Sequence, residues 1–395
     1  MKGIESVILQ LFEVLCHLLP VNSKKVFFQS FAGQYNDNPK AVSERMHERY
    51  PEIKIYWSIS SKSKQNDIPE YIHKVQYGTI KHIYLRNRCK VVIENGAGLY
   101  LYNTSNTILA KLKRHLKNKK QFDLSTWHGN PIKHIGAQIP NSVVWTSETA
   151  YSSSDLLLAG CHLIKGIFEQ AFINLMPVEL LGTPRTDILF DKSESRKNAI
   201  KEKLGLPSQK KVILYAPTYR YSPKDSGIFQ LQMMNFDALF NALQERFGGE
   251  WVFVMRVHNM VLLNIERSGL LDQYKDRLFN GNQFDDMNDY LYVCDVLISD
   301  YSGCIYDVAL TDKPCFLFAH DREYYEQHER GLYTPLSAFP YQFANTFSEL
   351  LDLIAGYNYE RQEQQRVDFL RMIGNIEDGH AADRVIDKIF SILQK

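Results

Sequence analysis

The sequence lacks the motifs by which many nucleotide-binding and metal-binding proteins are identified. It contains no GxGxxG dinucleotide fingerprint, no GxxxxGK(S/T) phosphate loop and no CxxC pair. These absences argue against an NAD-dependent enzyme and a P-loop NTPase, and they leave the cysteines without the spacing of zinc ligands. No internal repeat and no low-complexity tract is visible either.

The chain also has little net charge and few cysteines. Its 46 Lys and Arg residues are balanced by 45 Asp and Glu residues, which gives a formal charge of +1. Without a basic excess there is no reason to expect a nucleic acid partner, and we predict none. The six cysteines stand mostly within apolar runs, which predicts buried free thiols in a reducing compartment.

Long hydrophobic runs are absent as well. The best candidate, residues 4–19, is about 16 residues long where ~20 are needed to span a bilayer, and its helical periodicity ends at Pro20. Glu5 and Glu13 within it argue against a signal peptide, so we expect a cytoplasmic protein. An amphipathic helix over residues 1–20 could pack on the core or lie in a membrane interface, and the sequence leaves both open.

A basic cluster, KLKRHLKNKK from Lys111 to Lys120, has six Lys or Arg residues in ten. Such a run is most often a solvated loop. Contact with anionic lipid or a lipid diphosphate is the competing interpretation, because basic residues contribute about 1 kcal/mol each beside an anionic leaflet. We therefore predict peripheral membrane contact through the amino-terminal helix and this cluster.

Strand-like and helix-like patterns alternate along the chain. Its 395 residues suit two domains of roughly 150–200 residues. The alternation predicts an α/β protein with two doubly wound, Rossmann-like domains, residues 21–184 and 185–395. Strands are expected at residues 25–31, 54–59, 90–93, 122–127, 143–146, 156–159, 178–181, 212–216, 251–256, 296–298 and 315–318, and helices at 39–49 and 162–172, with a linker and short helix over 191–203.

One polar turn stands between two buried strands of the second half. The stretch from Asp295 to Phe318 has the pattern of an apolar strand, a polar turn, a helix and a second apolar strand. In α/β folds, ligands bind beyond the carboxyl ends of strands, where N–H groups at a helix start favour phosphate. An ordinary capped turn with Ser302 as N-cap is the equally open alternative. The turn itself is Ser299-Asp300-Tyr301-Ser302-Gly303.

Three further polar clusters directly follow apolar runs. They are WHGNPIKHIG at residues 127–136, APTYR at 216–220 and RVH at 256–258. Four strand ends that carry Arg, His, Ser and Thr favour one shared ligand site over four separate helix caps.

Together with LGTPRTDILF at residues 181–190 and DGHAADR at 378–384, these motifs occur in the order seen in the CDP-glycerol glycerophosphotransferase family. The chain resembles this family over residues 122–384. The family includes enzymes that prime and polymerise wall teichoic acid, and related ones that use CDP-ribitol or build capsule polymers. The resemblance implies a GT-B fold, two Rossmann-like domains facing across a cleft, and an enzyme held peripherally at the cytoplasmic face of the cell membrane. The family usually has Thr where this chain has Asn130 and a second Ser where it has Gly303, which bears on donor or acceptor choice.

The resemblance implies a transferase that moves a polyol phosphate, most simply glycerol phosphate, from a CDP-polyol to a hydroxyl of a lipid-linked or saccharide acceptor and releases CMP. Positioning and charge stabilisation supply most of the rate of such a transfer.

His128 is the candidate base, with a structural His bonded to backbone as the alternative. Arg256 and His258 are two apart on an extended segment, so we expect them to clamp the diphosphate together. The alternative for Arg256 is an interdomain salt bridge. The remaining substrate-binding candidates are Gly129, Asn130, Lys133, Thr218, Arg220, Ser299, Asp300, Ser302 and Gly303.

No cofactor is expected, although a divalent cation could enter with the substrate diphosphate. The aspartates of the second half lack EF-hand spacing, and a structural role is favoured for them over a metal site. Three alternative functions stay open: a CDP-ribitol ribitolphosphotransferase, a GT-B glycosyltransferase that uses a nucleotide sugar and releases a nucleoside diphosphate, and a non-catalytic polymer- or lipid-binding module.

Overall fold

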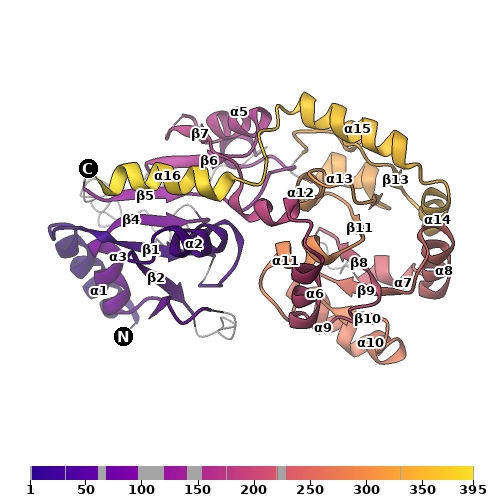
Figure 1. Cartoon of the computed structure of the whole chain (residues 1–395), viewed down its shortest axis with the longest axis horizontal. Coiled ribbons are helices and arrows are strands. Elements are labelled where there is room, and N and C mark those ends of the chain that lie inside the picture. The colour runs from indigo at the N-terminus through magenta and orange to yellow at the C-terminus, as the bar shows by residue number, and fades with distance from the viewer. Residues whose placement is uncertain are drawn as a thin grey trace. The chain divides into compact units, whose positions relative to one another are not determined.

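The computed structural model describes residues 2–31, 33–60, 68–96, 120–139, 154–174, 176–218, 220, 228–329 and 331–394. The chain forms two compact units, each built on a parallel sheet with helices packed against it (Figure 1). Unit 1 contains Met1–His128, Ile135–Ile188 and Gly374–Lys395, and unit 2 contains Gly129–His134 and Leu189–Ile373. The predicted α/β architecture with two doubly wound sheets is confirmed.

The sheet of unit 1 has the strand order β3-β2-β1-β4-β5-β6-β7, and its neighbouring strands are parallel. Chain order reverses between β1 and β4, which is where doubly wound sheets bind ligands. The strands are β1 Asn22–Gln29, β2 Lys54–Ile59, β3 His73–Gln76, β4 Cys89–Glu94, β5 Phe122–Ser125, β6 Leu156–Ala159 and β7 Val178–Leu180.

Alternation along the central strands explains why helices cover both faces of this sheet. Val26 and Phe28 of β1 belong to one buried cluster with residues of α2 (Asp37–Arg49) and α16 (Ala381–Leu393). Phe27, between them, packs in a second cluster with Leu85 of α3 (Ile80–Arg88). Successive strand side chains point to opposite faces, so a fully apolar strand needs cover on both.

The sheet of unit 2 repeats this design with the order β10-β9-β8-β11-β12-β13, again parallel throughout. Its reversal point lies between β8 and β11. The strands are β8 Lys211–Ala216, β9 Trp251–Met255, β10 Leu278–Asn280, β11 Val296–Ser299, β12 Cys315–Phe318 and β13 Phe343–Ala344. The remaining helices are α1 Lys2–Cys16, α5 His162–Ala171, α6 Glu194–Lys203, α7 Ile228–Gln232, α8 Phe236–Phe247, α9 Asn259–Ser268, α10 Leu270–Gln273, α11 Met287–Val293, α12 Cys304–Val308, α13 Arg322–His328, α14 Phe347–Ala355 and α15 Tyr359–Met372.

Ten of the eleven predicted strands are observed, with ends that differ by no more than a few residues. The eleventh, residues 143–146, lies outside the described residues. Three strands were not predicted: β3, β10 and β13. Each is short and stands at or near a sheet edge, where no long apolar run is required.

The carboxyl-terminal segment differs from the predicted domain boundaries, which assigned residues 185–395 to one domain. Residues from Gly374 onward pack with unit 1. Figure 1 shows α16 lying along unit 1. Val385, Ile386 and Ile389 on its apolar face are completely buried in the unit 1 core. Arg45 of α2 adds an ion pair to Asp383 at 2.9 Å. A helix with such a wide apolar face must be covered, and the sequence alone does not say which sheet covers it.

The segment before α16 holds a strongly perturbed carboxyl group, Glu377. Both of its carboxylate oxygens are buried, and this burial raises its pKa to about 7. Its ionisation is therefore less favourable in the folded state than in the unfolded state. The free energy of unfolding should fall as the pH rises from about 4.5 to about 7, by up to about 3 kcal/mol.

Glu377→Gln should remove this pH dependence and make the protein more stable than wild type at pH 8, with the two converging near pH 4. Denaturant unfolding at several pH values measures both curves. Exposed Glu360→Gln on α15 is the control, with no change expected. A wild-type curve that stays flat between pH 4.5 and 7 would contradict the prediction.

Candidate active site

In unit 1, His128 follows β5 at the carboxyl edge of the sheet and has an exposed surface. Its Nδ1 lies 3.0 Å from the carbonyl oxygen of Asn95, which follows β4. A carbonyl oxygen can only accept, so Nδ1 carries the proton and Nε2 is the acceptor in the neutral ring. The surrounding protein shields part of the ring from water, which lowers its pKa. The charge of Arg185 acts in the same direction, and the Asn95 hydrogen bond and the charge of Asp37 oppose it. His128 is therefore held neutral, with Nε2 ready to accept a proton.

Asn95 joins three polar groups beneath His128. Its side-chain NH₂ donates to Ser30 Oγ at 2.9 Å and to Asp37 Oδ2 at 2.7 Å. Its side-chain oxygen accepts from the backbone N–H of Phe31 at 2.8 Å. Asn95 and Ser30 are completely buried. The ends of β1 and β4 and the start of α2 are thus fixed together at the reversal point of the sheet.

Arg185 completes the network from the segment after β7. Its guanidinium donates to Asp37 Oδ1 and to the backbone oxygen of His128, both at 3.1 Å. Its backbone N–H donates to Asn38 Oδ1, and Asn38 in turn donates to the carbonyl of Trp127. The backbone on both sides of the imidazole is therefore held by side chains from α2 and from the segment after β7.

Three non-glycine residues at this edge adopt left-handed backbone angles. The φ angles are 42° for Phe31, 61° for Asp37 and 53° for Trp127. Such angles cost of order 1–3 kcal/mol each and persist where the surrounding structure enforces them, often at functional sites. The strain surrounds His128 and supports the view that this edge is built for function.

In unit 2, the ends of β8, β11 and β12 are joined by a buried ion cluster. Arg220 donates to Asp300 at 2.6 Å and to both oxygens of Asp321 at 2.7 and 2.9 Å. All three side chains are largely buried. Tyr301 and Tyr325 stack at 3.7 Å, and the guanidinium of Arg220 lies within 6 Å of both rings, at 5.6 and 5.8 Å. Arg220 and Asp300 were predicted as donor-binding residues, and here they bind each other.

Thr218 and Ser299 lie beside this cluster. The N–H of Thr218 donates to Asp300 Oδ1 at 2.7 Å, while its buried hydroxyl oxygen has no hydrogen-bond partner among the described residues. Ser299 is buried and donates to the carbonyl of Ala216 at 2.7 Å, which ties the end of β11 to β8. Of the two hydroxyls, only that of Thr218 is left for a ligand.

After β9, Arg256 and His258 have different surroundings. The guanidinium of Arg256 donates to the carbonyls of Gly281, Phe284 and Asp285, so it holds the loop after β10. The backbone N–H of Val257 donates to the side-chain oxygen of Asn282, and the side-chain NH₂ of Asn282 donates to the Val257 carbonyl oxygen. His258 is exposed. The guanidinium of Arg256 is thus engaged by loop carbonyls, and the clamping of the diphosphate by Arg256 and His258 stays a prediction.

The turn from β11 to α12 carries Ser302 and Gly303, both partly exposed. The carbonyl oxygen of Asn130 lies directly against Gly303. Gly129 has a φ of 122°, which favours glycine. Lys133 places its Nζ 5.2 Å from the ring of Tyr325. Asn130 thus contacts this turn, and Lys133 lies over Tyr325, which stacks on Tyr301 of the turn.

Four residues that hold the predicted residues in place were not predicted from the sequence: Asn95, Asp37, Asp321 and Asn282. Asn95 and Asp321 follow the strands β4 and β12 within three residues, and Asp37 begins α2, eight residues after the end of β1. Strand-end position, the signal used for the other candidates, could therefore have found Asn95 and Asp321. Asn282 follows the three-residue β10, which gave no such signal.

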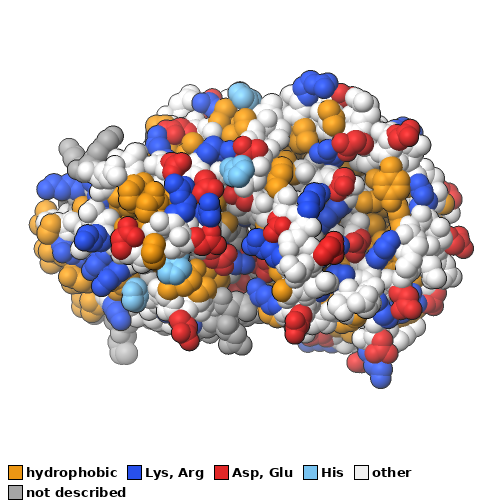
Figure 2. Space-filling model, viewed as in Figure 1, with side chains coloured by type: hydrophobic (Ala, Val, Ile, Leu, Met, Phe, Trp, Pro, Cys, Tyr) orange, Lys and Arg blue, Asp and Glu red, His pale blue; other side chains and the backbone are white. Residues whose placement is uncertain are grey.

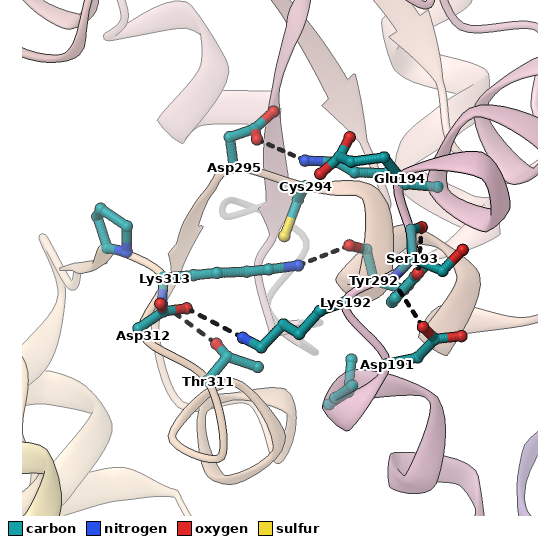
Figure 3. A pocket seen from close by; sticks show the side chains of 13 residues that line it. Asp191, Lys192, Ser193, Glu194, Tyr292, Cys294, Asp295, Thr311, Asp312 and Lys313 are labelled. Carbon is teal, nitrogen blue, oxygen red and sulfur yellow. Dashed lines mark hydrogen bonds and ion pairs between the residues drawn. The ribbon is translucent and has the colours of Figure 1, made fainter.

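A cavity of about 320 Å³ in unit 2 lies away from these residues, at the amino ends of β11 and β12 (Figure 3). Two of its lysines are bound to protein groups: Lys197 forms an ion pair with Asp295 at 2.8 Å, and Lys313 donates to the carbonyl oxygen of Tyr292 at 2.6 Å. It faces the edge of the sheet opposite to the one that binds ligands in such folds. We therefore do not assign it to the reaction. Among the described residues, no three His, Cys, Asp or Glu side chains are grouped to hold a metal ion.

Comparison with known proteins identifies the relatives of this chain. The family model described as CDP-Glycerol:Poly(glycerophosphate) glycerophosphotransferase matches residues 11–391. The teichoic acid glycerol-phosphate transferase of Staphylococcus aureus (strain NCTC 8325 / PS 47) is 28% identical over 98% of both chains. The teichoic acid poly(glycerol phosphate) polymerase of Bacillus subtilis (strain 168) is 30% identical over 80% of this chain and 41% of its own length. The corresponding polymerase of Staphylococcus epidermidis is 27% identical over 93% of this chain. The chain spans 51% of that polymerase.

The fold is shared with a solved structure, the wall teichoic acid polymerase TagF. The TM-score is 0.79 at 23% identity, over 100% of this chain and 96% of that one. The likeness confirms a fold of the GT-B type.

Proposed function

Because the chain belongs to the CDP-glycerol:poly(glycerophosphate) glycerophosphotransferase family, we propose that it transfers glycerol phosphate from CDP-glycerol to a hydroxyl group of a membrane-linked acceptor. CMP is the second product. The observation that carries the proposal is the contact of His128 Nδ1 with the Asn95 carbonyl oxygen at 3.0 Å, which leaves Nε2 as the acceptor nitrogen at the reversal point of the first sheet. A phosphotransferase that uses an alcohol as nucleophile needs such a base.

In the proposed reaction, Nε2 of His128 takes the proton of the acceptor hydroxyl as its oxygen attacks the β-phosphorus. A new P–O bond forms, and the bond between this phosphorus and the oxygen of CMP breaks. The carbonyl of Asn95 stabilises the imidazolium that results, because it accepts from Nδ1–H throughout. Arg185 and Asn38 hold the backbone on either side of the ring, and we assign them positioning roles.

We place the CDP moiety at the reversal point of the second sheet. The Thr218 hydroxyl, the exposed His258 and the turn at Ser302 and Gly303 are the groups there that a diphosphate could use. Lys133 adds a cation near this turn. Arg220, Asp300, Ser299 and Arg256 support this surface from below, since their polar atoms bind protein groups.

The test is incubation of the full-length protein with a membrane-linked acceptor and CDP-glycerol, CDP-ribitol or a nucleotide sugar in turn. Release of CMP from CDP-glycerol supports the proposal, and a preference for CDP-ribitol would change the donor. Release of a nucleoside diphosphate from the sugar donor, with no CMP from the others, would identify a glycosyltransferase. Absence of any release would favour a binding module.

We also propose peripheral contact with the membrane through α1. No helix in the described part of the chain is long and apolar enough to cross a membrane. Cys16 of α1 is buried, whereas a row of apolar side chains on and just after the helix is exposed. Hydrophobic side chains are visible at that edge of unit 1 (Figure 2). The exposed fractions are 56% for Ile8, 50% for Leu11, 62% for Leu15 and 81% for Leu18. One face of α1 therefore packs on the unit, and another is left for an apolar medium. The basic cluster of residues 111–120, except Lys120, lies outside the described residues.

Replacing Leu11, Leu15 and Leu18 together by Gln should weaken binding to anionic liposomes about tenfold or more, because three apolar side chains no longer enter the interface. Flotation with phosphatidylglycerol vesicles measures this. The control replaces Tyr359 and Met372, which are 53% and 58% exposed on α15, by Gln. Equal binding by the two variants would contradict membrane contact through α1.

A further inference from the structure

Residues 129–134, called the arm from here on, form a short extended piece of unit 2. The peptide bond between His128 and Gly129 joins unit 1 to this arm. Lys133 pairs with Leu332 in an antiparallel bridge. The N–H of His134 donates to the Gly331 carbonyl at 3.1 Å, and the N–H of Tyr333 donates to the Ile132 carbonyl at 2.8 Å. The arm is therefore fixed to the segment after α13 by backbone pairing.

Side chains anchor the arm as well. Ile132 is 2% exposed, which makes it the apolar anchor. Lys133 lies over the ring of Tyr325, and the ring of His134 lies 4.6 Å from that of Tyr333. Through the stacked Tyr325 and Tyr301, the arm also reaches the buried cluster around Arg220.

Gly303 touches the other end of the arm. Its backbone angles, φ −57° and ψ −21°, are open to any residue, so conformation does not require glycine. Space does: a Cβ at this position would lie 2.8 Å from the carbonyl oxygen of Asn130. That oxygen is backbone, so the clash cannot be relieved by turning a side chain. A side chain at residue 303 must push the arm or the turn away.

A second glycine makes room near the opposite end. A Cβ on Gly331 would lie 2.9 Å from Nδ1 of His134. Two positions that are distant in sequence, 303 and 331, are thus both glycine where the arm packs against them. Gly331 also has a φ of 81°, which by itself favours glycine, so the argument from space rests on Gly303.

We propose that Gly303 and Gly331 form a seat for the arm, and that Gly303 is a positioning residue for turnover. The inference rests on the proposed function, in which His128 is the base. The arm begins at the residue bonded to His128, so a displaced Asn130 moves the backbone that carries the imidazole. Ser302 and Gly303 belong to the turn assigned to the donor, so the same contact sets the arm against the donor-binding turn.

The test compares Gly303→Ala with Ile132→Ala, which loosens the arm by removing its anchor instead of adding a clash. Both variants should speed hydrogen exchange at the N–H groups of His134 and Tyr333 by about tenfold or more, because these donors lose their partners when the arm lifts. The kcat for CMP release from CDP-glycerol should fall about ten- to hundredfold, with little change in KM, as expected of a misplaced catalytic group. Exchange elsewhere in unit 2 should stay as in wild type.

Gly166→Ala is the matched control. Gly166 lies within α5, and a Cβ there meets no heavy atom within 4 Å. It should leave exchange at the arm and kcat unchanged.

Unchanged exchange at His134 and Tyr333 in Gly303→Ala and Ile132→Ala would overturn the seat. Faster exchange with unchanged kcat would overturn the positioning role. If the wild-type protein releases no CMP, the proposed function and the positioning role fail together. The exchange measurement then still decides on the seat, since it needs no substrate. If Gly303→Ala does not fold, Ile132→Ala gives the same readouts.

Discussion

His128→Ala is expected to lower turnover by about two to four orders of magnitude, while CDP-glycerol still binds. The imidazole of His128 stands at the end of β5. Its Nδ1 is hydrogen-bonded to the Asn95 carbonyl oxygen, so Nε2 is the nitrogen that can accept a proton. The donor is assigned to residues after β8, β9 and β11, so its affinity should be kept. Steady-state CMP release gives turnover, and calorimetric titration of CDP-glycerol gives binding.

The matched control is His73→Ala, which removes an exposed histidine from β3 of the same unit and should leave turnover unchanged. Because burial lowers the pKa of His128, the base stays neutral to lower pH than an ordinary histidine. In the pH profile of kcat/KM, the midpoint of the acid limb should therefore lie below pH 6.5. Near wild-type turnover in His128→Ala would remove this residue from the reaction.

The sequence predicted most of the fold because the central strands are buried on both faces. A short apolar run such as Val212 to Tyr215, bounded by polar turns, is typical of a buried parallel strand. The edge strands β3 and β13 escaped, since HKVQ and the two-residue FA carry no such signal. The return of α16 to unit 1 escaped for another reason. Its apolar face is evident in the sequence, but the partner of that face is decided by packing across nearly the whole chain.

For the site, strand-end position predicted which residues gather, and it did not predict how they are used. Arg220 and Asp300 were expected to bind the donor because a single sequence shows each without its partner, and Asp321 stands twenty-one residues after Asp300. Asn130 and Gly303 were both singled out as departures from the usual family pattern. The structure shows them in contact, a relation that no spacing in the sequence contains.

Arg220→Ala is expected to lower the free energy of unfolding of unit 2 by about 3–5 kcal/mol, because it leaves two buried carboxylates without their cation. The Arg220 side chain is 4% exposed, and those of Asp300 and Asp321 are 1% and 11% exposed. The two aspartates also hold Thr218 and Tyr301 through hydrogen bonds, so the ends of β8, β11 and β12 should loosen together. The loss in free energy of unfolding is measured by denaturant unfolding, with hydrogen exchange at the amides of unit 2 as the readout.

The control is Arg371→Ala, which breaks the exposed ion pair of Arg371 with Asp368 at 2.9 Å and should cost no more than about 1 kcal/mol. The pH dependence separates a lost charge from lost packing. Burial opposes ionisation of Asp321, but the hydrogen bonds and charge of Arg220 outweigh it and hold the pKa below its ordinary value. This contribution is present above the unfolded pKa and is lost as the pH falls through the folded one. The gap between wild type and Arg220→Ala should therefore narrow in acid, where protonation relieves the unpaired carboxylates. A gap that stays constant from neutral pH to pH 3 would show that Arg220 stabilises unit 2 by packing of its stem and not by its charge.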